Sequence, residues 1–182
     1  MRFISTTIPD VICIEPKIHG DHRGFFMETY HVEKFAAAGI TERFIQDNHS
    51  RSIGGTLRGL HYQNPRPQGK LVRCLIGEIY DIAVDLRRSS PSFGKWVGVI
   101  LSQENMHQLW IPSGFAHGFV VRSKVAEIAY KCTDLYAPES EHTIRWDDPS
   151  LAIDWQVTDL SSLVISNRDL AGTKFTEARY FD

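Results

Sequence analysis

The chain contains few cysteines, and none of them lies close to another. Cys13, Cys74 and Cys132 are odd in number, far apart, and each falls within an apolar or mixed run of residues. A disulfide framework or a structural zinc site needs paired or clustered cysteines. The spacing argues against both and predicts buried free thiols, which fit a reducing compartment.

Long apolar runs and basic runs are also missing. No stretch of about 18 apolar residues could cross a membrane, and the first ten residues have neither the apolar core nor the cleavage motif of a signal peptide. We therefore expect a cytoplasmic protein without a membrane partner. The net charge of −2 and the absence of Lys/Arg clusters argue against a nucleic-acid polymer as partner. A small phosphorylated ligand needs only a few local cations, which Arg23, Arg58, Lys70 and Arg73 could supply.

Length and composition are those of an ordinary globular domain. The chain has 182 residues, of which 42% are apolar and 23% charged. This is enough for one well-packed core and too little for two. We expect residues 1–182 to form a single domain.

Short runs typical of β-strands follow one another closely, separated by glycine- and proline-containing turns. Strands are expected over residues 11–15, 24–30, 44–50, 56–63, 70–76, 78–86, 96–101, 108–111, 115–121 and 126–132. This pattern predicts an all-β sandwich or barrel with a few short helices.

Two segments have a clear periodicity. Between residues 80 and 86, apolar side chains alternate with Asp81 and Asp85, and this period of two predicts a strand with one core face. Residues 31–39 are rich in alanine and end in a glycine, which favours a short outer helix closed by a left-handed residue. The mixed segment after Thr143 is expected to pack across the barrel.

The most informative stretch for function covers residues 57–73. It places a proton acceptor, His61, and two cations, Arg58 and Lys70, between strand-like segments. Rigid elements hold catalytic geometry better than mobile loops do. The combination predicts an active site for an anionic substrate.

Two motifs are shared with the cupins. Residues 112–117 fit the pattern P-x-G-x-x-H, and His61 stands between two glycines as in the first cupin motif. The chain thus resembles a cupin, whose fold is a double-stranded β-helix or jelly roll. Two of the usual metal ligands are replaced by Gln63 and Lys70. Because a cation at Lys70 would repel a metal ion and stabilise an oxyanion, we expect a site with no metal or other cofactor.

A narrower resemblance covers nearly the whole chain. The matching segments are residues 20–26, 46–50, 57–61, 68–73, 110–119 and 146–149. In this order and spacing they are similar to the dTDP-4-dehydrorhamnose 3,5-epimerase family. The resemblance implies an isomerase that inverts C3 and C5 of dTDP-4-dehydro-6-deoxy-D-glucose to give dTDP-4-dehydro-L-rhamnose, in deoxysugar supply for polysaccharide biosynthesis.

The resemblance assigns catalytic roles to four residues. A ketone at C4 acidifies the hydrogens on C3 and C5, so one base, His61, can serve both centres. Asp169 matches the carboxylate that orients this base. Lys70 would stabilise the enolate oxygen, and Tyr130 would deliver a proton to the opposite face.

Further positions resemble those that surround the family's ligand. The residues expected to bind substrate are Arg23, Phe25, Phe26, Glu28, Gln46, Asn48, Arg58 and His117. Adjacent residues on a strand point to opposite faces, so only one of the two phenylalanines is expected to reach ligand while the other joins the core. Exchange of N-terminal strands in some members of the family implies a homodimer.

The remaining histidines have simpler interpretations. His49 beside Asn48 fits a pocket or solvent equally well, and the other histidines are expected to be surface or structural residues. These are His19, His22, His31, His107 and His142.

Three alternatives stay open. A relative could invert only C3 or only C5, or accept another nucleotide 4-ketosugar, because the position of the proton donor decides which centre is completed. A metal-dependent cupin enzyme is disfavoured by Gln63 and Lys70. A noncatalytic sugar-binding cupin would have no need of His61, Asp169 and Tyr130 together.

Overall fold

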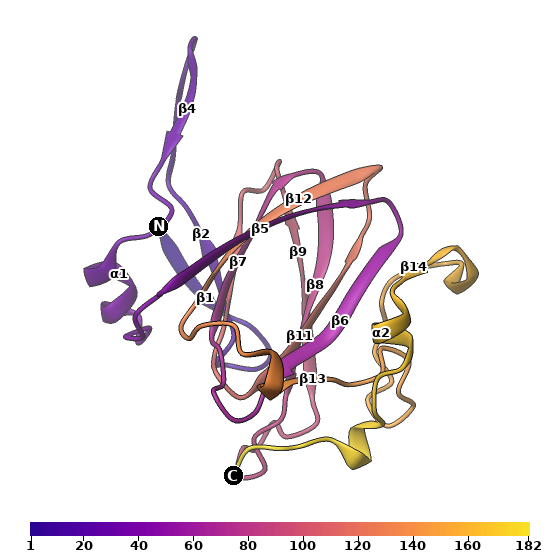
Figure 1. The fold of residues 1–182 in the computed structure, drawn as a ribbon. Helices are drawn as coiled ribbons and strands as arrows, with labels where there is room; N and C mark the ends of the chain where they lie inside the picture. Colours follow the sequence, from indigo (N-terminus) through magenta and orange to yellow (C-terminus); the bar gives the residue numbers. More distant parts are fainter.

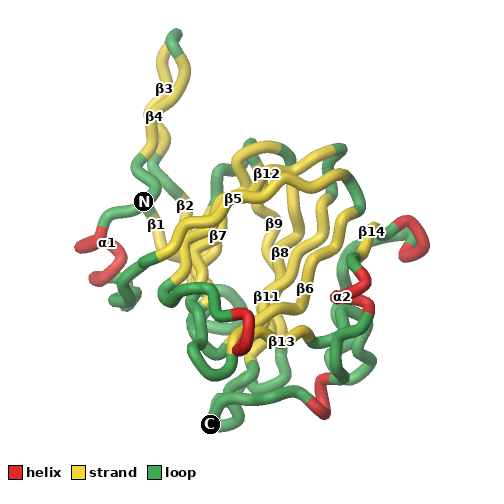
Figure 2. Tube along the Cα trace, viewed as in Figure 1, coloured by secondary structure: helices red, strands yellow, loops and turns green.

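Two antiparallel β-sheets face each other in the computed structural model, which describes residues 1–182 (Figures 1 and 2). The first sheet has the order β1 (Arg2–Ser5), β2 (Ile12–Glu15), β10 (Gln108–Ile111), β7 (Lys70–Ile76), β12 (Val125–Cys132) and β5 (Gln46–Ile53). The second has the order β13 (Glu141–Thr143), β6 (Thr56–Gln63), β11 (Phe115–Val121), β8 (Glu78–Asp85) and β9 (Trp96–Ser102), and β14 (Val164–Ile165) pairs with β6 in parallel. The prediction of an all-β, cupin-type jelly roll is confirmed.

The helices are few and short, as expected. They are α1 (Val32–Ala37), α2 (Asn167–Leu170) and the 3₁₀ turns η1 (Pro138–Ser140), η2 (Leu160–Ser162) and η3 (Phe175–Glu177). Gly39 follows α1 with a left-handed φ of 86°, as the sequence predicts. No helix has the length and apolar character needed to cross a membrane.

Three apolar clusters hold the sheets. The largest fills the interior between them, with members such as Val72, Phe115 and Ile128. A second covers the outer face of the β6–β11–β8 sheet, where the C-terminal segment packs. Trp155 is buried in this cluster and its Nε1–H donates to the Trp146 carbonyl at 2.9 Å. The expectation that the tail crosses the barrel is therefore confirmed. The third cluster lies between α1 and the β10–β7 region, around the buried Phe35.

Strand β8 departs from its predicted one-sided burial. The Ile82 face packs under the C-terminal segment, as the alternation suggests, but Asp81 and Asp85 on the other face are completely buried as well. Ala83, between them, belongs to the interior cluster. The expectation of a single core face was wrong, because the tail turns the outer face of this central strand into a second core.

Local patterns placed most strands well and missed four short ones. Strands β6, β7, β10 and β11 have the predicted bounds, whereas β5 begins two residues later than expected and extends to Ile53. Strands β1, β3, β13 and β14 were not predicted. Each has at most four residues, and most are exposed, so the alternation that reveals a half-buried strand is absent.

A hairpin formed by β3 (Ile18–Asp21) and β4 (Gly24–Met27) belongs to neither sheet. Figure 1 shows it projecting from the barrel beside the N-terminus. The two strands pair only with each other. An isolated two-stranded hairpin is marginally stable in water, which makes this projection unusual for a segment with large apolar side chains.

The cysteines are free thiols, as predicted. Cys74 and Cys132 are buried, and Cys13 is half-buried.

Candidate active site

A cavity of about 300 Å³ opens between the two sheets, and we call it the reaction cavity. Its lining comprises Gln46, Asn48, His61, Tyr62, Gln63, Gln68, Lys70, Tyr130, Cys132, Tyr136 and Glu141. Three of the four predicted catalytic residues lie in this lining, and the fourth, Asp169, contacts one of them.

His61 and Asp169 form a close pair although 108 positions separate them in the chain. Nε2–H of His61 donates to Oδ1 of Asp169 at 2.6 Å. Asp169 lies in α2, whose first turn is capped by the Ser166 hydroxyl. Since the carboxylate accepts the Nε2 proton, Nδ1 of the neutral imidazole is the nitrogen free to act as a base.

The Asp169 carboxylate is ionised in this setting. Burial by itself would raise the pKa of Asp169, but the hydrogen bond and attraction from His61, with a further bond from the Gly59 N–H, bring that pKa below its usual value. A permanently charged partner fixes the imidazole tautomer and stabilises an imidazolium that forms beside it.

Lys70 and Tyr130 come from neighbouring strands of the other sheet. Register pairs Lys70 on β7 with Cys132 on β12, and Tyr130 lies two residues before that cysteine on the same face. Burial lowers the pKa of Lys70, whereas burial raises the pKa of the Tyr130 phenol. The phenol therefore keeps its proton at neutral pH, as a proton donor must.

The base and the phenol approach the reaction cavity from opposite walls. His61 belongs to β6 of the second sheet, and Tyr130 to β12 of the first (Figure 2). A planar carbon held between the two sheets would meet a proton acceptor on one face and a proton donor on the other. This is the geometry that inversion at carbon requires.

Amide side chains complete the wall near Tyr130. Gln46 and Asn48 both line the cavity, and Nε2 of Gln46 donates to Oδ1 of Asn48 at 3.1 Å. Asn48 also donates to the Cys132 thiol at 3.6 Å. Gln46, Asn48 and Cys132 therefore stand side by side, with two amides available to hydroxyl or carbonyl groups of a ligand.

Sequence reasoning missed a hydrogen-bonded group beside the reaction cavity, which consists of Tyr136, Glu141 and Arg168. The Tyr136 hydroxyl donates to Glu141 at 2.5 Å, and Arg168 pairs with the same carboxylate at 2.6 Å. Burial opposes ionisation of Glu141, but these two partners lower its pKa. Tyr136 and Glu141 flank η1, in a segment without strand periodicity. The only sequence signal for a role in the site was the position of this segment after the strand that carries Tyr130.

Beside the reaction cavity lies a second hollow of about 540 Å³, here named the side cleft. The two share His61, and the side cleft also contains Asp169 and three arginines, Arg51, Arg58 and Arg168. Arg58 donates from Nε to the Ser52 hydroxyl at 3.1 Å. Arg51 and Arg168 are paired with Glu127 and Glu141, which leaves Arg58 as the arginine without a carboxylate partner. A cleft with arginines that adjoins a base-bearing cavity at His61 suits an anionic group attached to the reacting one.

Gln63 has a structural role where a metal-binding cupin has a histidine. It is buried, its amide nitrogen donates to the carbonyls of Arg66 and Leu135, and its oxygen accepts from the Ala137 N–H. No group of three or more His, Cys, Asp or Glu side chains is arranged to hold a metal ion. The available amide and lysine do not form a metal-binding set.

His117 shares the inner face of the second sheet with His61 but is not part of the cavity lining. It is buried, faces His61 across the β11–β6 pair, and bonds through Nε2 to Oδ1 of Asp81 at 2.8 Å. The predicted contact between His117 and the sugar is therefore not evident in the cavity lining.

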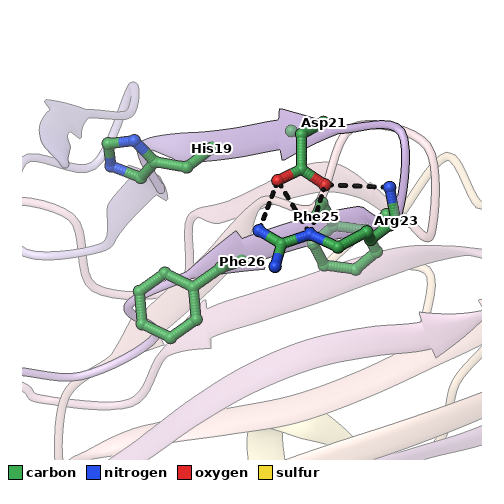
Figure 3. Close-up of a pocket in the computed structure, with 7 residues that line it drawn as sticks. His19, Asp21, Arg23, Phe25 and Phe26 are labelled. Carbon is green, nitrogen blue, oxygen red and sulfur yellow. Dashed lines mark hydrogen bonds and ion pairs between the residues drawn. The ribbon is translucent and has the colours of Figure 1, made fainter.

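Four predicted ligand contacts lie on the β3–β4 hairpin region, apart from the reaction cavity. Figure 3 draws Arg23, Phe25 and Phe26 in a shallow hollow of the hairpin, where Arg23 pairs with Asp21 at 2.6 Å. Glu28 just beyond β4 pairs with Lys34 at 2.7 Å. One chain does not bring these side chains to His61.

The expectation that one of the two phenylalanines is a core residue was wrong. Phe25 is 57% exposed and Phe26 is 71% exposed. The strand alternation is present, but the hairpin has no second layer in this chain against which either face could be buried.

Two other candidates lie on the outer face of the first sheet. Arg73 is three residues after Lys70 on β7, so its side chain points to the opposite face, where it lines another small cavity that shares Asn48 and Tyr130 with the reaction cavity. The expectation that Arg73 could supply a cation to a phosphorylated ligand stays a prediction. His49 pairs with Glu127 at 3.0 Å and is also outside the reaction cavity.

Comparison with known proteins gives consistent results. The dTDP-4-dehydrorhamnose 3,5-epimerase family matches residues 5–177. The Shigella flexneri dTDP-4-dehydrorhamnose 3,5-epimerase is 54% identical, over 100% of this chain and 99% of its own length. The crystal structure of the Legionella pneumophila dTDP-6-deoxy-D-glucose-3,5-epimerase, in complex with dTDP-4-keto-L-rhamnose, has a TM-score of 0.94 and 53% identity, covering 98% of this chain and 94% of that one.

A 3′-monoepimerase from Streptomyces bikiniensis, crystallised with dTDP-quinovose, is more distant. Its TM-score is 0.86 and its identity 32%, over 94% of this chain and 87% of its own. The match over almost the whole length, together with the high identity to the Shigella protein, means that the chain belongs to the dTDP-4-dehydrorhamnose 3,5-epimerase family.

Proposed function

We propose that residues 1–182 act as one domain that epimerises C3 and C5 of dTDP-4-dehydro-6-deoxy-D-glucose, giving dTDP-4-dehydro-L-rhamnose. The observation that carries this proposal is the placement of an Asp169-bonded His61 and a protonated Tyr130 on opposite walls of one cavity. The reactions named for the similar proteins from Shigella and Legionella support it.

The first step is removal of a proton next to the C4 ketone. Nδ1 of His61 takes the proton from C5 or C3, and the electrons of the broken C–H bond form an enolate whose charge rests on the C4 oxygen. The imidazolium that results is stabilised by Asp169. Lys70, as an ammonium in the cavity lining, stabilises the enolate oxygen.

The second step returns a proton to the other face of the same carbon. The Tyr130 hydroxyl supplies it, the enolate electrons form the new C–H bond, and the ketone is restored. The tyrosinate then regains a proton, and His61 releases one, through solvent. Because each neighbour of C4 passes through the same type of enolate, the two centres use one set of side chains.

The side cleft suits the diphosphate. Arg58, Arg51 and Arg168 line it, and it opens onto His61. A diphosphate held there would leave the hexose in the reaction cavity, beside Lys70. In this arrangement the arginines bind the ground state and the transition state alike, whereas His61, Lys70 and Tyr130 act on the reacting carbons.

We further propose a homodimer in which each β3–β4 hairpin completes the site of the partner subunit. The support is the pair of exposed phenylalanines, Phe25 and Phe26, on a hairpin that has no core of its own. Arg23 and Glu28 lie on or just beyond the same hairpin, so the proposal accounts for all four residues that one chain leaves far from His61. Three free thiols fit a cytoplasmic location.

A mono-epimerase is the second candidate, because a 3′-monoepimerase shares this fold. The identity to that protein is 32%, against 53% to the Legionella 3,5-epimerase. The double epimerisation is therefore the better supported of the two.

The test is proton NMR of dTDP-4-dehydro-6-deoxy-glucose in D₂O with the purified protein, following deuterium entry at C3 and C5 separately. The proposal expects deuterium at both carbons and conversion to the L-rhamno product. Deuterium at one carbon only would replace it by a mono-epimerase. Ligand binding without exchange at either carbon would indicate a noncatalytic sugar-binding protein.

A further inference from the structure

A buried carboxylate stands behind the reaction cavity with half of its hydrogen-bonding capacity unused. Asp81 on β8 is completely buried. Its Oδ1 is bonded to His117 Nε2 at 2.8 Å, while its Oδ2 has no hydrogen-bond partner. Buried polar groups are nearly always paired, so an orphaned carboxylate oxygen calls for a specific reason.

The surroundings of Asp81 are apolar, so leaving Oδ2 without a hydrogen-bond partner costs free energy. Its neighbours on the same face of β8, Ile79 and Ala83, belong to the apolar interior cluster, as does Val72 on the facing sheet. Lys70 precedes Val72 by two residues on β7, so its side chain leaves the same face of that strand. Asp81 and Lys70 therefore face a common interior from opposite sheets.

Lys70 needs support for its charge. Burial lowers the pKa of Lys70, and the negative groups around it, Asp81 among them, oppose that loss. Asp81 attracts Lys70 by its charge across the interior, and no hydrogen bond joins Oδ2 to the ammonium. Such attraction is stronger in an apolar interior than in water.

We propose that Asp81, fixed in orientation by His117, is a positioning residue that keeps Lys70 in its ammonium form so that it can stabilise the enolate. This inference deepens the proposed epimerase chemistry and depends on it for the role of Lys70. It also gives His117 a function outside the cavity lining, as the group that orients the carboxylate.

The titratable groups that face the interior around Lys70 come from several elements. They are His61 on β6, Asp81 on β8, His117 on β11, Tyr130 and Cys132 on β12, Tyr136 in the following loop and Glu141 on β13. Burial raises the pKa of Tyr130 and of Cys132 and lowers that of Lys70.

The direct experiment measures the titration of Lys70 without substrate. Protein labelled with [¹³C]lysine is titrated by NMR, and the Lys70 resonance is assigned by its absence in Lys70→Gln. Asp81→Asn should lower the Lys70 midpoint by about one pH unit, a tenfold change in its acid dissociation constant. Asp47→Asn, which removes a carboxylate from the outer face of the first sheet, should leave the midpoint in place. An unchanged midpoint in Asp81→Asn overturns the proposal.

Activity supplies a second readout. When kcat is measured against pH, its decrease at high pH should occur at lower pH in Asp81→Asn than in the wild type. The shift should equal that of the Lys70 midpoint, with KM little changed. In a Lys70→Gln background the same substitution should have no further effect on kcat. An equal loss of kcat in both backgrounds would contradict action through Lys70.

Should Asp81→Asn fail to fold, Lys70→Gln tests the same pairing. Removing the cation leaves a buried carboxylate without its counter-charge, so the melting temperature should fall in Lys70→Gln and fall less in Lys70→Arg, which keeps a cation. An equal fall in both variants overturns the inference. If the Lys70 midpoint moves in Asp81→Asn but the wild type exchanges no deuterium into the nucleotide sugar, the electrostatic pairing holds and the proposed reaction fails.

Discussion

At the scale of single residues, the proposed mechanism separates groups that act on the reacting carbon from groups that hold the ligand. His61 is bonded to Asp169 in the lining of the reaction cavity, whereas Arg58 lines the side cleft and shares no hydrogen bond with that pair. Loss of a base is expected to slow the chemical step, while loss of a diphosphate contact should weaken binding throughout the reaction.

His61→Asn should therefore lower kcat by at least about 10²-fold, the usual contribution of a general base. The asparagine keeps a polar side chain beside Asp169, so folding and binding of dTDP should stay close to those of the wild type. The measurement combines steady-state kinetics with calorimetric titration of dTDP. Turnover within tenfold of the wild type would rule out His61 as the base.

Arg58→Ala is the matched comparison for that experiment. It should raise KM and weaken dTDP binding while leaving kcat near the wild-type value, because the lost contact is uniform along the reaction. An unchanged dTDP affinity would remove Arg58 from the diphosphate site.

At the scale of elements, the end of β8 is a polar junction that ties the barrel to the chain's last residues. Asp85 is fully buried and accepts hydrogen bonds from Arg87, Ser90 and Ser92. Arg87 also bridges to Phe181 through an isolated backbone pairing. The junction therefore couples the central strand of the second sheet to the C-terminal segment that covers it.

The charge state of Asp85 links this junction to acid stability. Burial opposes ionisation, but the hydrogen bonds from Arg87, Ser90 and Ser92 lower the pKa of Asp85 from 3.8 to about 2. Because the folded-state pKa is the lower one, the stabilisation is complete above pH 4 and is lost as pH falls toward 2. The linkage is worth roughly 2 kcal/mol at neutral pH.

Asp85→Asn should thus lower the free energy of unfolding at pH 7 by about 2 kcal/mol, and the difference from the wild type should shrink at pH 3. Urea unfolding at the two pH values measures this. Asp47→Asn, at an exposed pair with Lys131, should change little at either pH. A difference between wild type and Asp85→Asn that is the same at pH 7 and pH 3 would contradict the assignment.

At the scale of the whole molecule, the position of the β3–β4 hairpin is the basis of the proposed homodimer. The hairpin carries Arg23 and two exposed phenylalanines, yet projects from the barrel (Figure 1). In a twofold-symmetric dimer each hairpin would serve the other subunit, and both sites would be completed by equivalent contacts. The reaction cavity and the residues that complete it would then come from different chains.

This arrangement predicts complementation between two variants. His61→Asn supplies an intact hairpin and Arg23→Ala an intact base, so a coexpressed mixture should contain heterodimers with one complete site. With random pairing, about a quarter of the wild-type activity should appear at low substrate concentration, far above either variant alone. A mixture of His61→Asn with Asp169→Asn should regain nothing, since both lesions fall in the same half of the site. No gain in the first mixture would mean that the hairpin does not act on a partner.

Some features of this protein follow from local sequence. The strand-like runs of residues 56–63, 70–76 and 115–121 were identified correctly as strands, because residue composition and the turn residues at each end are local properties. The same segments pointed to His61 and Lys70, which the cavity brings together. The sequence alone also shows Gln63 and Lys70 at positions where metal-binding cupins have metal ligands.

Other features depend on how distant segments pack. Asp169 reaches His61 across 108 positions, and nothing in its local helix indicates that contact. Arg73 lies near Lys70 in sequence but on the other side of the sheet. Asp81 lies opposite the apolar face of its strand, yet it is buried because its own face meets the first sheet while the tail covers the apolar face. Local periodicity specifies which side chains share a face, whereas only the packing of sheets, tail and hairpin decides what each face meets.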